Sequence, residues 1–185
     1  TYTSKNGAKS KAGTIGDVAS TSFFPSKNLG CYGDGGAIFT NNDDLAQTIR
    51  GIVNHGMYKR YHHDVVGVNS RLDSIQAAVL DAKLPHLDNY NKARQNAAKK
   101  YNSAFKNHPN IETPKAGNGC NTICENCDCH VFHQYTLKLK NTDRDALVAH
   151  LNSKGIPCGV YYPIPLHKQK AYVDKRYNDA DFKVT

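Results

Sequence analysis

The stretch TSFFPSK, residues 21–27, ends a predicted strand and carries the residues on which the interpretation of this chain depends. Residues 18–24 are small, β-branched and aromatic, which favours a strand, and Pro25 then bends the chain. The bend leaves the Ser22 hydroxyl and the Lys27 amine close enough to reach two ends of one small ring. An amine held away from water titrates lower and becomes a usable nucleophile and base. Taken alone, however, such a lysine is more often a solvated loop residue.

The residues that follow this stretch predict a second strand and a capped helix. A glycine-rich turn over residues 30–36 leads to a short strand, residues 37–40. Asn42 or Asp43 is suited to cap a helix with apolar residues at helical spacing, and Gly56 is a suitable end for it. Glycines can also cradle a phosphate, but no helix start follows these directly, so a turn between strands is the better interpretation.

The second half of the chain predicts a long helical segment followed by a small α/β lobe. Residues 71–105 predict helix with one apolar face, in which Pro85 causes a kink or a break. Residues 131–139 alternate as a strand does, a helix over residues 143–151 is capped by its first residue, and residues 158–162 predict a further strand. The first half has too few strands for a complete sheet, so we expect part of a larger α/β protein.

Composition restricts the class of protein. The 185 residues are 39% hydrophobic and 22% charged, with 11 Tyr and 6 Phe, which favours a globular chain. No apolar run is long enough for a membrane span, and residues 1–5 lack the apolar core of a secretory signal, so we expect a cytoplasmic protein with no membrane partner. The net charge of +8 is spread along the chain, which argues against a nucleic-acid partner and suits a phosphate-bearing ligand.

Several thiols and imidazoles gather in one polar stretch. They are Cys120, Cys124, Cys127, Cys129, His130 and His133. The set contains a single Cys-x-x-Cys pair, and the spacing of its last two cysteines is tight for one tetrahedral ion. We therefore expect free thiols on a surface loop and no metal, with a zinc or iron–sulfur site as the alternative.

Four motifs, in one order, resemble the sugar aminotransferases of the DegT/DnrJ/EryC1/StrS family, which are fold-type-I pyridoxal-phosphate enzymes. They are residues 22–30 (SFFPSKNLG), 33–37 (GDGGA), 67–78 (GVNSRLDSIQAA) and 161–167 (YYPIPLH). The resemblance implies a fold-type-I α/β fold, with residues 1–86 at the C-terminal end of the large cofactor-binding domain and residues 87–185 in an incomplete small domain. The aspartate that pairs with the cofactor ring nitrogen in the family would lie upstream of residue 1, so we expect this piece alone to be inactive.

The resemblance also implies a role for individual residues. Lys27 would hold pyridoxal 5'-phosphate covalently and move the proton during catalysis, and Ser22 would bind the cofactor phosphate. Asn69 would bind the phosphate in the neighbouring subunit's site, because family active sites are shared across a homodimer; Asn69 could also cap the helix that follows. Tyr161 and Tyr162 resemble the family's substrate loop and would contact the sugar.

One branch of the family gives the best match, the branch that aminates a UDP-linked 3-keto hexuronate. Residues 60–63 (RYHH) and the 67–71 segment resemble it, and there Arg71 would bind the sugar carboxylate, which a guanidinium fork matches well. The amino donor implied is L-glutamate, and amino-sugar or surface-polysaccharide synthesis is the setting. Two alternatives stay open: amination of a 4-keto-6-deoxy sugar nucleotide, and a basic metal-binding nucleic-acid module built on the cysteine loop.

Overall fold

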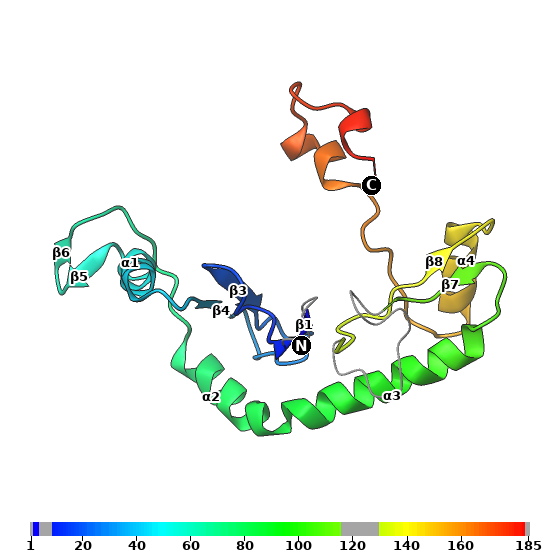
Figure 1. The fold of residues 1–185 in the computed structure, drawn as a ribbon, viewed down its shortest axis with the longest axis horizontal. Helices are drawn as coiled ribbons and strands as arrows, with labels where there is room; N and C mark the ends of the chain where they lie inside the picture. Colours follow the sequence, from blue (N-terminus) through cyan, green and yellow to red (C-terminus); the bar gives the residue numbers. More distant parts are fainter. Residues whose placement is uncertain (1, 4–8, 116–129, 184–185) are drawn as a thin grey trace. The chain divides into compact units, whose positions relative to one another are not determined.

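The computed structural model describes residues 2–3, 9–115 and 130–183, and the chain divides into two compact units. The first unit contains residues 1–107 and 113–135, and the second contains residues 108–112 and 136–185. Figure 1 shows the elements of each unit along the chain. The cysteine loop that the sequence analysis singled out, residues 120–129, lies outside the described residues.

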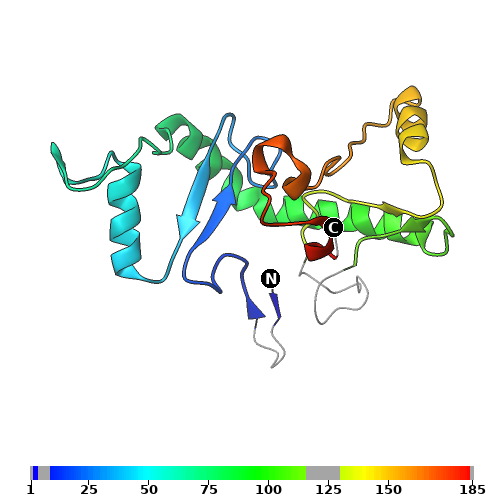
Figure 2. The ribbon, with the colours of Figure 1, turned by 90° about the horizontal axis from the view of Figure 1, so that it is seen from above.

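An antiparallel hairpin frames the loop that carries Lys27. Strands β3 (Ala19–Ser22) and β4 (Gly36–Phe39) pair from Ala19↔Phe39 to Ser22↔Gly36, and Figure 2 shows them side by side. The pairing confirms both predicted strands and the predicted turn between them, with ends shifted by one or two residues. A second antiparallel pair, β1 (Tyr2–Thr3) and β2 (Lys9–Ser10), precedes this hairpin.

Helix α1 (Asp43–Val53) begins as the sequence predicts. The Asn42 side chain caps it by accepting a hydrogen bond from the Leu45 N–H at 3.0 Å. Beyond the helix, Gly56 has φ +73° and its N–H donates to the Gly51 carbonyl, so the chain turns there into strands β5 (Met57–Lys59) and β6 (His62–His63). A Cβ at Gly56 would lie 1.7 Å from the Val65 carbonyl oxygen, so the close approach itself requires glycine.

The predicted long helical segment consists of two helices joined by a 3-10 turn. Helix α2 (Ser74–Lys83), the turn η1 (Leu84–His86) and helix α3 (Leu87–Phe105) follow one another, and Pro85 lies in the turn as expected. The predicted start at Arg71 is wrong, and so is the helix-cap role for Asn69, because Asp73 occupies the cap position of α2. Residues 68–70 instead run along the end of α1, where the N–H groups of Val68 and Ser70 donate to the Ile52 and Val53 carbonyls.

The strand predicted over residues 131–139 is mostly absent. Only β8 (Lys138–Leu139) forms at its end, and it pairs with β7 (Ile111–Glu112) in the second unit. The earlier residues give their carbonyl oxygens to side chains of α3 instead: Arg94 donates to both Phe132 and His133, at 3.1 and 3.0 Å. These guanidinium contacts replace the ladder bonds that a neighbouring strand would supply.

The second unit is held by short elements and their caps. Asp143 caps helix α4 (Arg144–Ser153) through bonds from the N–H groups of Asp145 and Ala146, and Gly155 turns the chain at φ +69°, as predicted. The strand predicted over residues 158–162 is wrong, because these residues pair with no other strand that the structure describes. Three 3-10 turns follow, η2 (Leu166–Lys168), η3 (Lys170–Tyr172) and η4 (Asp179–Asp181).

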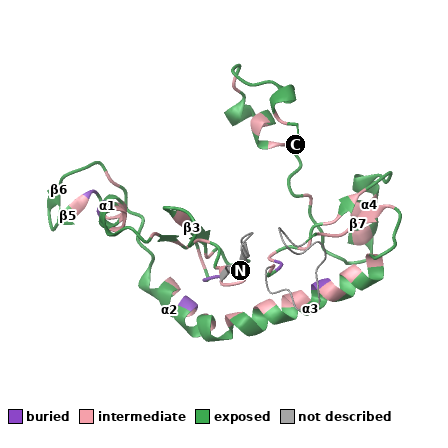
Figure 3. Ribbon diagram, viewed as in Figure 1, coloured by how far each residue is buried: buried purple, intermediate pink, exposed green. Residues whose placement is uncertain are grey.

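Few apolar side chains are buried within the described residues. The buried ones are Cys31, Leu80, Ala98 and Phe132. Figure 3 colours all buried residues purple, glycines included. Large apolar side chains elsewhere are exposed, Val66 by 98% and Tyr162 by 82%. Exposed apolar surface of this extent marks regions that contact other protein segments or ligands. None of the described helices has the length and apolar character needed to cross a bilayer.

Candidate active site

Lys27 lies in the loop between β3 and β4. Its backbone N–H donates to the Phe24 carbonyl at 2.8 Å, which closes a turn around Pro25 and so realises the predicted bend. The side chain is half-buried, and within the described part of the chain its amine has no hydrogen-bond or ion-pair partner. An amine held in a turn and left unpaired is available to a ligand.

Ser22, the last residue of β3, has its hydroxyl oriented by the backbone. Its Oγ accepts a hydrogen bond from the Phe24 N–H at 3.2 Å, so the hydroxyl proton stays free to donate. Ser22 also lines a cavity of about 970 Å³ formed by the hairpin, α1 and the segment before α2. Arg71 lines the same cavity, so the structure brings these two predicted site residues to one space.

The side chains of Asn69 and Arg71 are exposed and hydrogen-bonded to each other. The Arg71 Nε–H donates to Asn69 Oδ1 at 3.2 Å, and one terminal nitrogen donates to Asn54 Oδ1 at 3.3 Å. A backbone bridge between Asn54 and Asn69 joins this pair to the end of α1. The two amides orient the guanidinium and leave its other N–H donors free for an anion.

Tyr161 and Tyr162 belong to the second unit. Both side chains are exposed, and their rings meet edge to face with centroids 5.6 Å apart. The structure therefore places Ser22, Lys27, Asn69 and Arg71 within one unit, and it describes the two tyrosines only within the other.

Neither of two polar residues near Lys27 was assigned to its site from the sequence: Asn28 was not singled out, and His133 was considered only as a possible metal ligand. Asn28 donates to Asn91 Oδ1 at 2.8 Å and to the Val131 carbonyl at 3.1 Å, while its own Oδ1 is buried without a partner. His133 likewise has a buried Nδ1 without a partner. Burial lowers the pKa of His133, and the positive charges of Lys27 and Arg94 lower it further. The sequence offered no signal for either role, because both depend on segments that meet only in the fold.

This donor set fits pyridoxal phosphate. A free amine can meet the cofactor aldehyde, and a hydroxyl with an available proton can meet the phosphate at the other end of the ring. Asn28 Oδ1 and His133 Nδ1 are buried without a partner among the described residues. Because buried polar atoms are normally hydrogen-bonded, these two atoms are available to bond to a ligand beside the lysine. Among the described residues, no group of three or more His, Cys, Asp or Glu side chains is arranged to hold a metal ion.

The fold and this site define an α/β chain with a half-buried lysine in the loop between β3 and β4, and comparison with known proteins gives its family. Residues 2–185 match the DegT/DnrJ/EryC1/StrS aminotransferase family, and the chain belongs to it. It is 48% identical over 162 residues to the UDP-2-acetamido-2-deoxy-3-oxo-D-glucuronate aminotransferase of Pseudomonas aeruginosa, covering 88% of this chain and 42% of that protein. It is 44% identical over 160 residues to the UDP-N-acetyl-3-dehydro-alpha-D-glucosamine 3-aminotransferase of Acidithiobacillus ferrooxidans, covering 86% and 40%.

Solved structures agree with this family. The chain resembles a DegT/DnrJ/EryC1/StrS aminotransferase from Brucella abortus with a TM-score of 0.74 and 43% identity, over 86% of this chain and 40% of that one. It resembles NtdA from Bacillus subtilis, solved with the cofactor PMP, with a TM-score of 0.69 and 30% identity, over 83% and 35%. The predicted family and fold class, a partial fold-type-I α/β fold, are confirmed, and the nucleic-acid module has no support. The chain spans less than half the length of these relatives.

Proposed function

We propose that the protein containing this chain is a pyridoxal-phosphate-dependent aminotransferase that acts on a nucleotide-linked keto sugar. The observation that carries the proposal is the Lys27 amine, which has no hydrogen-bond or ion-pair partner among the described residues, on a turn a few residues from the Ser22 hydroxyl. The match of residues 2–185 to an aminotransferase family supports it, as do two relatives named for amination of UDP-linked 3-oxo sugars.

Lys27 and Ser22 bind opposite ends of the cofactor in this proposal. Ser22 donates its hydroxyl proton to a phosphate oxygen, which fixes one end of the ring. Lys27 binds the other end covalently, and once released it acts as base and acid, moving a proton at the carbon that carries the nitrogen. Pyridoxal phosphate, when bound, supplies the electron sink that makes this proton acidic.

Arg71 determines the substrate class in this proposal. Its guanidinium is held by Asn69 and Asn54, so the remaining N–H groups can meet a carboxylate as a fork without a large loss of side-chain entropy. A keto sugar that carries a carboxylate, a UDP-3-keto-hexuronate, is therefore the proposed acceptor, with L-glutamate as amino donor. Tyr161 and Tyr162 would supply further contacts to the sugar.

The assembly and setting belong to the same proposal. We infer a cytoplasmic homodimer in which Asn69 binds the cofactor phosphate of the neighbouring site. In the complete protein we place the boundary between the large and small domains after residue 86, where η1 ends. The complete enzyme would serve amino-sugar or surface-polysaccharide synthesis.

Chemical trapping on full-length protein tests the central point. Borohydride fixes a cofactor that is bound covalently through a lysine amine, and peptide mass mapping then locates it. We expect the label on Lys27 in the wild type and none in Lys27→Ala. A label on a different lysine, or wild-type protein that takes up no cofactor, would show that the proposal is wrong.

A further inference from the structure

One face of helix α2 fastens the loop that carries Lys27. Gln76 Oε1 accepts hydrogen bonds from two successive backbone N–H groups of this loop, those of Tyr32 at 2.9 Å and Gly33 at 3.0 Å. Two turns further along the same helix, Lys83 Nζ donates to the Gly30 carbonyl at 2.5 Å. Residues 76, 80 and 83 recur at helical spacing, and the middle one, Leu80, is buried with 8% of its surface exposed. The helix thus holds the loop through one acceptor, Gln76, and one donor, Lys83, on the same stripe as the buried Leu80.

Residues 30–35, the part of the loop that α2 holds, are closely packed. Cys31 is 1% exposed, and its Sγ lies 3.0 Å from the Phe23 carbonyl and 3.1 Å from the Gly33 carbonyl. A Cβ at Gly30 would lie 2.6 Å from the Pro25 carbonyl oxygen, and one at Gly35 would lie 2.7 Å from the Cys31 sulfur. Because these contacts join both sides of the loop, a displacement of residues 30–33 is passed to the turn that carries Lys27.

The same helix begins close to Arg71. Asp73 occupies the N-cap position of α2, and the hydrogen bonds of Arg71 to Asn69 and Asn54 fix the segment just before it. Gln76 lies in the first turn of the helix. Its two hydrogen bonds therefore connect the loop of Lys27 to the helix that begins just after Arg71.

We propose that Gln76 and Lys83 are positioning residues, which set the place of the Lys27 amine through residues 30–33. The inference rests on the proposed function, because it concerns how Lys27 meets its cofactor. Gln76 contributes an acceptor that two backbone N–H groups need, and no other acceptor bonds to these groups in the described part of the chain. Its loss removes both of these hydrogen bonds between the loop and α2 and leaves the Lys83–Gly30 hydrogen bond to hold the loop.

Substitutions at Gln76 test the role with an internal rescue. Gln76→Leu keeps the size but removes the acceptor, whereas Gln76→Glu keeps an oxygen that can accept both bonds. In full-length protein we expect Gln76→Leu to weaken cofactor binding about tenfold, the equivalent of one hydrogen bond with its unpaired groups, and Gln76→Glu to recover most of it. Lys83→Met should weaken binding in the same direction. Gln47→Leu and Lys92→Met, both at exposed helix positions, are the matched controls.

Two measurements distinguish failure of this inference from failure of the proposed function. Cofactor affinity is measured by absorbance titration of the ligand-free protein, and hydrogen exchange of the Tyr32 and Gly33 amides is measured without cofactor. Faster exchange at these two amides together with weaker cofactor binding in Gln76→Leu supports the positioning role. Faster exchange with unchanged cofactor affinity, or no rescue by Gln76→Glu, overturns it and leaves the proposed function standing. Wild-type protein that binds no cofactor overturns both.

Discussion

Arg71 donates a hydrogen bond from its Nε to Asn69 Oδ1 at 3.2 Å, so the two residues assigned to different ligands are joined to each other. Asn54 holds a terminal nitrogen of the same guanidinium at 3.3 Å. The fork is thereby oriented before any ligand arrives. Arg71 also lines the cavity that Ser22 lines.

Replacement of Arg71 should discriminate between two sugar substrates. A carboxylate held by a guanidinium fork contributes roughly 1.5–3 kcal/mol, so Arg71→Ala should lower kcat/KM on a keto-uronate by about ten- to a hundredfold. Arg71→Lys keeps the charge but loses the fork, and should fall between. A matched 6-deoxy keto sugar is the control, because it has no carboxylate to lose. Equal losses on both substrates, or a wild-type preference for the 6-deoxy sugar, would contradict the uronate assignment.

A subunit-mixing experiment tests whether the active site is shared. Lys27→Ala subunits and subunits carrying both Asn69→Ala and Arg71→Ala should each be inactive as homodimers. If Asn69 and Arg71 serve the neighbouring site, mixed dimers regain one intact site, and part of the activity should return. Native mass spectrometry confirms that heterodimers have formed. Inactive heterodimers would place all the residues of one site in one subunit.

His133 should titrate below its ordinary pKa of 6.5. Burial disfavours its charged form, and the nearby Lys27 and Arg94 charges add to this effect. NMR titration of the full-length, cofactor-free protein measures the pKa, and Lys27→Met should raise it, while Lys92→Met on the exposed side of α3 should not. Because the folded pKa is depressed, the contribution of His133 to stability is complete above pH 6.5 and declines as the pH falls below that value. If the pKa of His133 is the same in the wild type and in Lys27→Met, the two side chains are not close.

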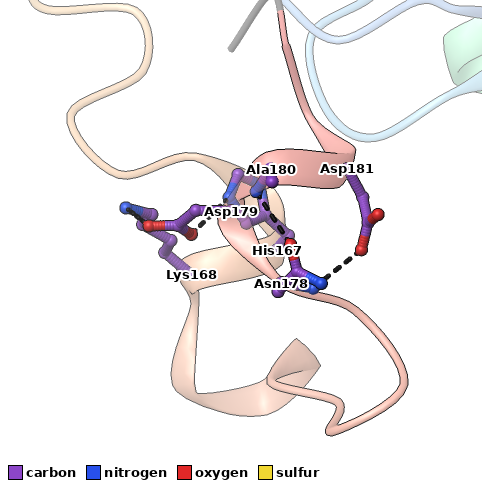
Figure 4. Close-up of polar contacts among 6 residues, drawn as sticks. All are labelled: His167, Lys168, Asn178, Asp179, Ala180 and Asp181. Atoms are coloured by element: carbon purple, nitrogen blue, oxygen red, sulfur yellow. Dashed lines mark hydrogen bonds and ion pairs between the residues drawn. The ribbon is translucent and has the colours of Figure 1, made fainter.

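The turns at the end of the second unit should depend on Asp179. Lys168 Nζ lies 2.8 Å from Asp179 Oδ2, and His167 Nε2 lies 3.6 Å from Oδ1. Figure 4 draws these side chains together. The hydrogen bond from Lys168 lowers the pKa of Asp179 below its ordinary value of 3.8. Because the folded pKa is depressed, the ionised Asp179 carboxylate stabilises these turns fully above pH 3.8. This stabilisation is lost as the pH falls through the folded pKa. NMR titration should show Lys168→Met raising the Asp179 pKa, with Lys170→Met, an exposed neighbour, as the control that leaves it unchanged.

The sequence by itself determined the local elements whose causes are local. Asn42 caps α1, Asp143 caps α4 and Pro85 breaks the long helical segment, because capping and proline geometry depend on a few consecutive residues. Four short motifs in one order indicated the family that residues 2–185 match, because each motif can be recognised within a few consecutive residues. The roles assigned to the individual site residues remain predictions.

Only the tertiary structure decided where segments far apart in the chain obtain their hydrogen bonds. Residues 131–137 alternate as a strand does, yet Arg94 takes the carbonyls of Phe132 and His133, so no strand forms there. Gln76 likewise satisfies the N–H groups of Tyr32 and Gly33 across 44 and 43 positions of sequence. Alternation and propensity report the preference of a short window, whereas a backbone donor or acceptor bonds to whatever partner the fold brings within about 3 Å.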